Sequence, residues 1–228
     1  MSDGRVITVN VAVPMRSTAK KVGITGIDKR PVDHPVAVRA PGPKTAGLHS
    51  GLVGDQIFDV AHHGGDDQAV YVYAREDLDV WAAELGRELP GGVFGENLTT
   101  SGLDVTGALI GERWRIGADL VLEVSVPREP CNTFARWMDV PGWLKTFTNR
   151  AVPGTYLRVI APGEVRAGDE IVVEHRPAHE VTVGVAFRAM TVERELLPRL
   201  LDAPALPAKI LAKAQKYADR LAASTPDQ

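Results

Sequence analysis

The stretch Leu120–Cys131, LVLEVSVPREPC, joins a β-strand pattern to the only cysteine of the chain. The apolar run Leu120–Val126 predicts a strand. Two prolines follow and end it, because proline fixes φ and lacks a donor N–H. The spacing in residues 132–138 is compatible with a short helix. Cys131 is therefore expected at or beside a helix N-terminus, just beyond the end of a strand.

The surroundings of Cys131 favour an ionised sulfur. Arg128 lies three residues before it and Arg136 five residues after it. Positive side chains and helical N–H groups favour thiolate over thiol, and such settings lower a cysteine pKa to about 3.5–7.5. A lone cysteine is also commonly a small buried hydrophobe. The flanking prolines and arginines favour the alternative, a reactive or metal-binding thiolate.

Composition limits the classes of protein to consider. The chain has 228 residues, of which 44% are hydrophobic and 24% charged, enough for a packed core in one large domain or a domain with an appendage. A net charge of −3 argues against broad binding to a nucleic-acid backbone. A single cysteine forms no internal disulfide, and no apolar run has the length of a membrane span. We expect a cytoplasmic protein that binds neither nucleic acid nor membrane.

Short strand patterns separated by glycine turns dominate the first three quarters of the sequence. One clear helix, Arg75–Leu89, interrupts them. The predicted fold is mixed α and β, mainly a β-barrel with inserted helices. The strands are predicted at Arg5–Pro14, Pro35–Arg39, Ala69–Tyr73, Ala108–Ile110, Arg113–Ile116, Leu120–Val126, Thr155–Ile160 and Glu170–Glu174.

The composition changes after about His175, where two or three amphipathic helices are expected. We therefore predict a barrel domain over residues 1–175 and a small C-terminal helical bundle over 176–228. The basic residues of the last helix, residues 208–222, fit a solvated face or a docking surface for a redox partner.

Polar segments between the strands supply candidate binding residues. His63-Gly64-Gly65 combines an imidazole with glycines that let a ligand approach the backbone, although a plain turn explains it equally. Glu96 and Asn97 follow a second glycine-punctuated loop, where they could orient a ligand or only a turn. Arg158 could face the barrel mouth or solvent. The spacing of ligands for zinc is missing.

These landmarks, in this order, resemble the MOSC family, named for the C-terminal domain of molybdenum cofactor sulfurase, and within it the bacterial YiiM-like branch. Together they span nearly all of residues 1–175, and the C-terminal helices resemble the extension of the same branch. The matching segments are Thr25–Lys29, Gly51–Asp55, His63–Gly65, Ala69–Tyr71, Phe94–Leu103, Ile110-Gly111, Val124-Ser125, Pro127-Arg128, Pro130-Cys131 and Tyr156–Val159.

The resemblance implies a barrel related to that of pyruvate kinase, with a cavity for the molybdenum cofactor and Cys131 as metal ligand or sulfur carrier. A soft thiolate suits such a metal, and a cofactor phosphate suits basic side chains and backbone N–H groups. The candidate cofactor-binding residues are Lys29, His63, Gly64, Gly65, Asn97, Arg128 and Arg158. Glu96 or Asp55 could supply or relay protons. Gln68 stands where the family commonly has lysine or arginine, which weakens anion binding if the side chain faces the cavity.

The implied activity is a molybdenum-dependent oxidoreductase that reduces N-hydroxylated compounds, such as hydroxylaminopurine base analogues. It would use a small-molecule substrate and an external electron-donor protein, and a homodimer is included among the expected assemblies. The alternative is a carrier that holds sulfur on Cys131 as a persulfide or passes cofactor to another protein, without turnover. A barrel that binds a small anion beside an inert cysteine is a third interpretation. Pyridoxal phosphate is not expected, because the chain has no room for the separate domain that binds it in full-length sulfurases.

Overall fold

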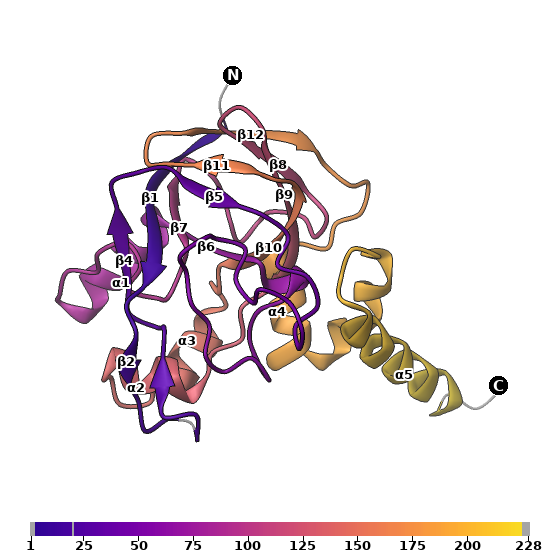
Figure 1. Cartoon of the computed structure of the whole chain (residues 1–228). Coiled ribbons are helices and arrows are strands. Elements are labelled where there is room, and N and C mark those ends of the chain that lie inside the picture. Colours follow the sequence, from indigo (N-terminus) through magenta and orange to yellow (C-terminus); the bar gives the residue numbers. More distant parts are fainter. Residues whose placement is uncertain (1–2, 20, 225–228) are drawn as a thin grey trace.

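Seven strands close into a barrel in the computed structural model, which describes residues 3–19 and 21–224. Their order around the barrel is β12-β8-β9-β10-β6-β7-β1, and β1 pairs with β12 to close it (Figure 1). The strands are β1 (Gly4–Ala12), β6 (Val70–Ala74), β7 (Leu98–Ser101), β8 (Arg113–Ile116), β9 (Leu120–Pro127), β10 (Thr155–Ala161) and β12 (Glu170–His175). The predicted β-barrel is confirmed.

All neighbouring strands of the barrel are antiparallel except β6 and β7, which run parallel. A parallel pair needs a crossover connection, and α1 (Arg75–Leu85) supplies it between these two strands. The helix ends earlier than predicted, because Gly86 takes a left-handed conformation with φ of 63°. The predicted strand Leu120–Val126 gains Pro127, which pairs with Thr155 at the last position of the ladder.

Several short strands lie outside the closed barrel. Two-stranded sheets form from β2 (Met15–Arg16) with β3 (Ile24–Thr25), and from β5 (Val36–Val38) with β11 (Gly163–Val165). β4 (Lys29–Val32), which is not among the predicted strands, pairs with β1. Proline is tolerated in such an edge strand. The segment 108–110, predicted as a strand, forms only an isolated bridge between Leu109 and Thr182.

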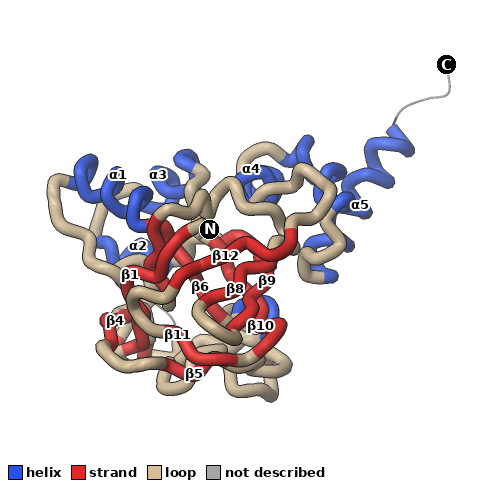
Figure 2. The backbone as a smooth tube through the Cα atoms, turned by 90° about the horizontal axis from the view of Figure 1, so that it is seen from above, coloured by secondary structure: helices blue, strands red, loops and turns tan. Residues whose placement is uncertain are grey.

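The helices lie in two groups, on opposite sides of the strands in Figure 2. The first group contains α1, α2 (Asn132–Met138) and α3 (Trp143–Arg150). Helices α2 and α3 lie in the connection between β9 and β10. The second group is α4 (Val183–Thr191), the 3₁₀ helix η2 (Arg194–Asp202) and α5 (Ala208–Ser224). No helix among the described residues is long and apolar enough to cross a membrane.

Two hydrophobic clusters correspond to these two groups. The larger fills the barrel and continues into the C-terminal helices, so that Leu122 and Leu200 belong to one cluster. The smaller is aromatic and lies among α1, α2, α3 and β6. Its rings pack at centroid distances of 4.8 to 6.4 Å, mostly edge to face.

A core substitution in η2 tests whether the C-terminal helices unfold with the barrel. Leu200 is fully buried, so Leu200→Ala should cost about 2–5 kcal/mol of unfolding free energy. Because the cluster is continuous, denaturation followed by tryptophan fluorescence and by circular dichroism should give one coincident transition. Leu201→Ala, at a neighbour that is 36% exposed, is the control and should have a much smaller effect. Two separated transitions would show that residues 176–228 are an independent folding unit.

Candidate functional site

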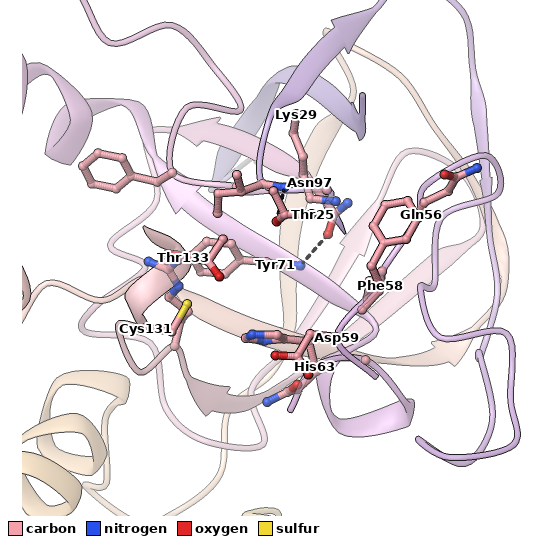
Figure 3. Close-up of a pocket in the computed structure, with 18 of the residues that line it drawn as sticks. Thr25, Lys29, Gln56, Phe58, Asp59, His63, Tyr71, Asn97, Cys131 and Thr133 are labelled. Carbon is pink, nitrogen blue, oxygen red and sulfur yellow. Dashed lines mark hydrogen bonds between the residues drawn. The ribbon is translucent and has the colours of Figure 1, made fainter. Parts of the chain in front are cut away.

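One pocket opens where loops from distant parts of the sequence meet beside the barrel (Figure 3). Its walls come from the β2–β3 hairpin, β4, the segments 56–68 and 94–97, β6, the turn after β9, and β10. Cys131, His63 and Tyr71 converge on this cavity. Six of the predicted site residues line it: Lys29, His63, Gly64, Asn97, Arg128 and Cys131.

Cys131 occupies the predicted position at the start of a helix. It is the N-cap residue of α2, with extended backbone angles of φ −130° and ψ 167°. Burial raises the pKa of its thiol, but a hydrogen bond with His63, the charge of Arg128 and the backbone N–H of Phe134 outweigh burial and lower the pKa to about 6. At neutral pH the sulfur is therefore mostly thiolate, exposed to the pocket and able to act as a nucleophile or a metal ligand.

Arg128 is a buried cation that pairs with no carboxylate among the residues that the structure describes. The residue is only 4% exposed, and its Nη1 has no hydrogen-bond partner among the described residues. The guanidinium lies 3.8 Å from the ring centroid of Phe134 and 5.5 Å from that of Tyr71, where cation–π attraction offsets part of the cost of burial. A buried donor left unpaired costs about 1–3 kcal/mol or more when charged. The pocket is thus prepared for an anionic or strongly accepting ligand group.

Lys29 also lines the pocket, but its positive charge is already paired with a carboxylate. Its Nζ lies 2.5 Å from Oδ1 of Asp55. The side chain of Asp55 is fully buried and also accepts hydrogen bonds from Ser50 Oγ and Asn97 Nδ2, at 2.7 and 3.0 Å. Burial raises the pKa of Asp55, but Lys29 and these donors lower it below the ordinary value overall. Asp55 therefore fixes Lys29 and Asn97 in place from behind the pocket wall.

Glu96 is fully buried and does not line the pocket. Its carboxylate accepts hydrogen bonds from the backbone N–H of Gly92 and Phe94, at 2.6 and 2.9 Å, and from Thr99 Oγ1 at 3.0 Å. Burial raises its pKa, while these donors oppose the rise. The residue holds the shape of the 92–99 loop. The structure brings neither Glu96 nor Asp55, our predicted proton donors, to the pocket surface.

Two further predicted residues lie away from the cavity lining. Arg158 pairs with Asp67 at 2.7 Å and with Glu123 at 3.1 Å. Gly65 is buried against Lys44, whose Cα would lie 2.8 Å from an added Cβ. Gly64 does line the pocket, and its φ of 85° together with the nearby His49 carbonyl requires glycine. Arg128, rather than Arg158, is the arginine available to a ligand.

Sequence reasoning missed the two pocket tyrosines. Tyr71 and Tyr156 are direct neighbours across β6 and β10, with ring centroids 5.1 Å apart. Burial raises the pKa of both hydroxyls, that of Tyr156 to about 12. All five residues of β6 are buried, so this strand lacks the alternation that identifies an inward-facing side chain. Gln68 also lines the pocket, and its Oε1 is buried without a partner among the described residues.

Alkylation provides a direct test of the thiolate, because Cys131 is the only cysteine. The rate of reaction with iodoacetamide should rise with pH about a midpoint near 6. Arg128→Met should move the midpoint upward, since removing a positive charge disfavours the thiolate. Arg158→Gln is the matched control and should leave the midpoint unchanged. A wild-type midpoint at the ordinary cysteine pKa of about 8.5 would show that His63 and Arg128 do not stabilise the thiolate.

Comparison with known proteins assigns the family. Residues 59–172 match the model of the MOSC domain. The uncharacterised protein YflK of Bacillus subtilis is 31% identical over 221 residues, which cover 95% of each chain. Protein YiiM of Escherichia coli is 33% identical over 162 residues, covering 68% of this chain and 71% of that protein. A protein named reductase from Gibberella moniliformis is 32% identical over 164 residues, covering 68% of this chain but only 28% of the longer fungal protein.

The architecture agrees with this assignment. The crystal structure of YiiM from Geobacillus stearothermophilus superposes with a TM-score of 0.74 at 27% identity, covering 93% of this chain and 98% of that chain. The matched MOSC region contains both His63 and the Arg128–Cys131 segment. The chain belongs to the MOSC domain family and is similar to its YiiM members.

Proposed function

We propose that this protein is a molybdenum-cofactor-dependent oxidoreductase that reduces N-hydroxylated small molecules to the corresponding amines. The observation that supports the proposal most is the pairing, in one pocket, of a low-pKa thiolate with a buried guanidinium whose Nη1 has no hydrogen-bond partner among the described residues. Thiolate binds a soft metal centre, while guanidinium binds phosphate or oxyanion groups. The fungal relative is named a reductase, and this supports a redox role for the domain.

The residues of the pocket fit a metal that arrives with its own ligands. Among the described residues, no group of three or more histidine, cysteine, aspartate or glutamate side chains could hold a bare metal ion. Cys131 could therefore supply one ligand to a metal already held by a dithiolene. When bound, such a cofactor supplies two-electron redox chemistry. This combination of one soft ligand and one free cation suits an anionic pterin cofactor.

The chain's own residues would have distinct tasks. Cys131 would bind the metal, with His63 beside it to stabilise the ionised sulfur. Arg128 would hold an anionic oxygen of the cofactor or substrate through its unpaired Nη1. Lys29, held by Asp55, would contribute donors from another wall of the pocket. Asn97 donates to Asp55 and to the Asn10 carbonyl, so it would hold that wall in place rather than bind the ligand through its N–H groups.

With Gln68, the pocket would carry less positive charge than a pocket with lysine or arginine at this position. Its side chain lines the cavity, so the substitution acts inside the pocket. Lys29 and Arg158 are paired with carboxylates, whereas Arg128 forms no ion pair with a carboxylate among the described residues. We infer that this protein holds its cofactor with fewer charge contacts, and that electrons come from a separate donor protein.

A carrier function is the second candidate, and the same thiolate favours it. A cysteine with a pKa of about 6 beside a histidine can attack the outer sulfur of a persulfide donor, whose S–S bond breaks as the donor thiolate leaves, and can then hold the sulfur as its own persulfide. A carrier would retain sulfur without metal and would show no turnover of hydroxylamines. The two functions therefore differ in what is bound to Cys131 and in catalysis.

Cys131→Ser should separate these functions. Gently purified wild-type protein should contain molybdenum and pterin, and should reduce an N-hydroxylated purine with reduced viologen as the electron source. The serine variant should lose at least about tenfold in molybdenum content, the scale seen when residues around a metal are changed. Arg158→Gln serves as the matched control and should keep its metal content.

Equal molybdenum in wild type and Cys131→Ser would exclude the cysteine as the metal anchor. Persulfide on wild-type Cys131, without metal and without hydroxylamine reduction, would support the carrier function instead. Mass spectrometry of the intact protein distinguishes the two states of the sulfur.

A further inference from the structure

The two pocket tyrosines use their hydroxyl protons differently. Tyr71 donates its proton to the backbone carbonyl of Pro153, at 2.8 Å, so this proton is committed to the protein. Tyr156 donates to no acceptor among the described residues. Its hydroxyl makes a hydrogen-bonding contact with the side chain of Arg128. Because guanidinium only donates, the Tyr156 oxygen is the acceptor in that contact and its O–H remains available to the pocket.

Tyr156 also keeps this proton at neutral pH. Burial raises the pKa of its hydroxyl, while the charge of Arg128 opposes the rise, and the value is about 12. The same charge would stabilise a tyrosinate formed for a short time when the proton is given away. Tyr156 thus has the two properties of a general acid: a proton to donate and a cation to support the conjugate base.

The other proton carriers near the cavity are engaged elsewhere. Glu96 and Asp55 are sealed behind the wall, as described above. Lys29 is bound to Asp55, and His63 contacts the Cys131 sulfur. Asp59, which lines the pocket, is hydrogen-bonded through Oδ1 to His62 Nδ1 at 2.8 Å. Tyr156 is an ionisable lining residue whose hydroxyl proton has no acceptor among the described residues.

We propose that Tyr156 is a catalytic residue that protonates the departing oxygen of the substrate, an inference that rests on the proposed reductase function. Reduction of R–NH–OH consumes two electrons from the external donor and two protons, and yields R–NH2 and water. The N–O bond breaks, the oxygen takes the Tyr156 proton as it leaves as water, and the nitrogen takes the second proton from solvent. The tyrosinate, paired with Arg128, is then reprotonated from solvent through the open pocket.

Tyr156→Phe tests this role with reduced viologen as donor and an N-hydroxylated purine as substrate. Removing a general acid should lower kcat by about 10²-fold or more and change KM little. Tyr73→Phe is the matched control: it removes another buried tyrosine hydroxyl of the same sheet, bonded to the Val152 carbonyl outside the pocket, and should keep wild-type kcat. Molybdenum content and the alkylation midpoint of Cys131, measured for each variant, should match wild type.

A substrate with a better leaving group provides the decisive comparison. An O-acetylated hydroxylamine releases acetate, which needs no proton to depart. Tyr156→Phe should therefore approach wild-type rate on this substrate while it remains slow on the free hydroxylamine. If Tyr156 only positioned the substrate or Arg128, both substrates would slow equally, and that result would overturn the proposal.

The remaining outcomes separate this proposal from the function on which it rests. Wild-type protein that reduces the hydroxylamine, with Tyr156→Phe equally fast, would overturn the role of Tyr156 and leave the reductase function standing. Wild-type protein that binds cofactor but reduces neither substrate would overturn both. Loss of molybdenum in Tyr156→Phe would assign the residue to cofactor binding and contradict proton donation.

Discussion

The site depends on one electrostatic arrangement, a buried guanidinium placed beside an ionised thiol. An isolated buried charge is costly, and proteins keep one only where partners compensate it. The compensation for Arg128 comes from the thiolate of Cys131 and from the aromatic faces of Phe134 and Tyr71. Each charge therefore lowers the cost of the other. Neither would be stable in this place alone, so the pocket functions as a unit.

The barrel strands fix the relative positions of the residues in this arrangement. Arg128 follows β9 directly and Cys131 lies three residues further on, while Tyr156 is the second residue of β10, the next strand of the barrel after α2 and α3. Register between β6 and β10 sets Tyr71 opposite Tyr156, and the Tyr71 backbone N–H is bound by the Asn97 side chain at 3.1 Å. Segments far apart in the sequence thus form one wall, and the aromatic cluster behind it keeps the wall rigid.

Local sequence patterns predicted the barrel and the Arg128–Cys131 segment, but they did not predict every other residue of the pocket. Cys131 and Arg128 could be found because the prolines, the charges and the helix start lie within one stretch, and the barrel because many short strands recur with glycine turns. β7 was missed because its threonines are polar, and Thr99 is accommodated in the core by hydrogen bonds with Glu96, in the preceding loop, and with Asn10, in β1. The same dependence on distant partners hid the sealed position of Asp55 and the outward pairing of Arg158.

Charge balance couples the two binding tasks that we assign to the pocket. While Cys131 is a free thiolate, its negative charge offsets that of Arg128. If the sulfur gives its electron pair to a metal, that offset weakens, and the guanidinium then requires another negative group close by. A cofactor that carries both the metal and an anionic group satisfies both demands at once, whereas a bare cation would leave two positive charges side by side. If the proposed function is correct, the need to compensate Arg128 would make the pocket select for a negatively charged metal complex.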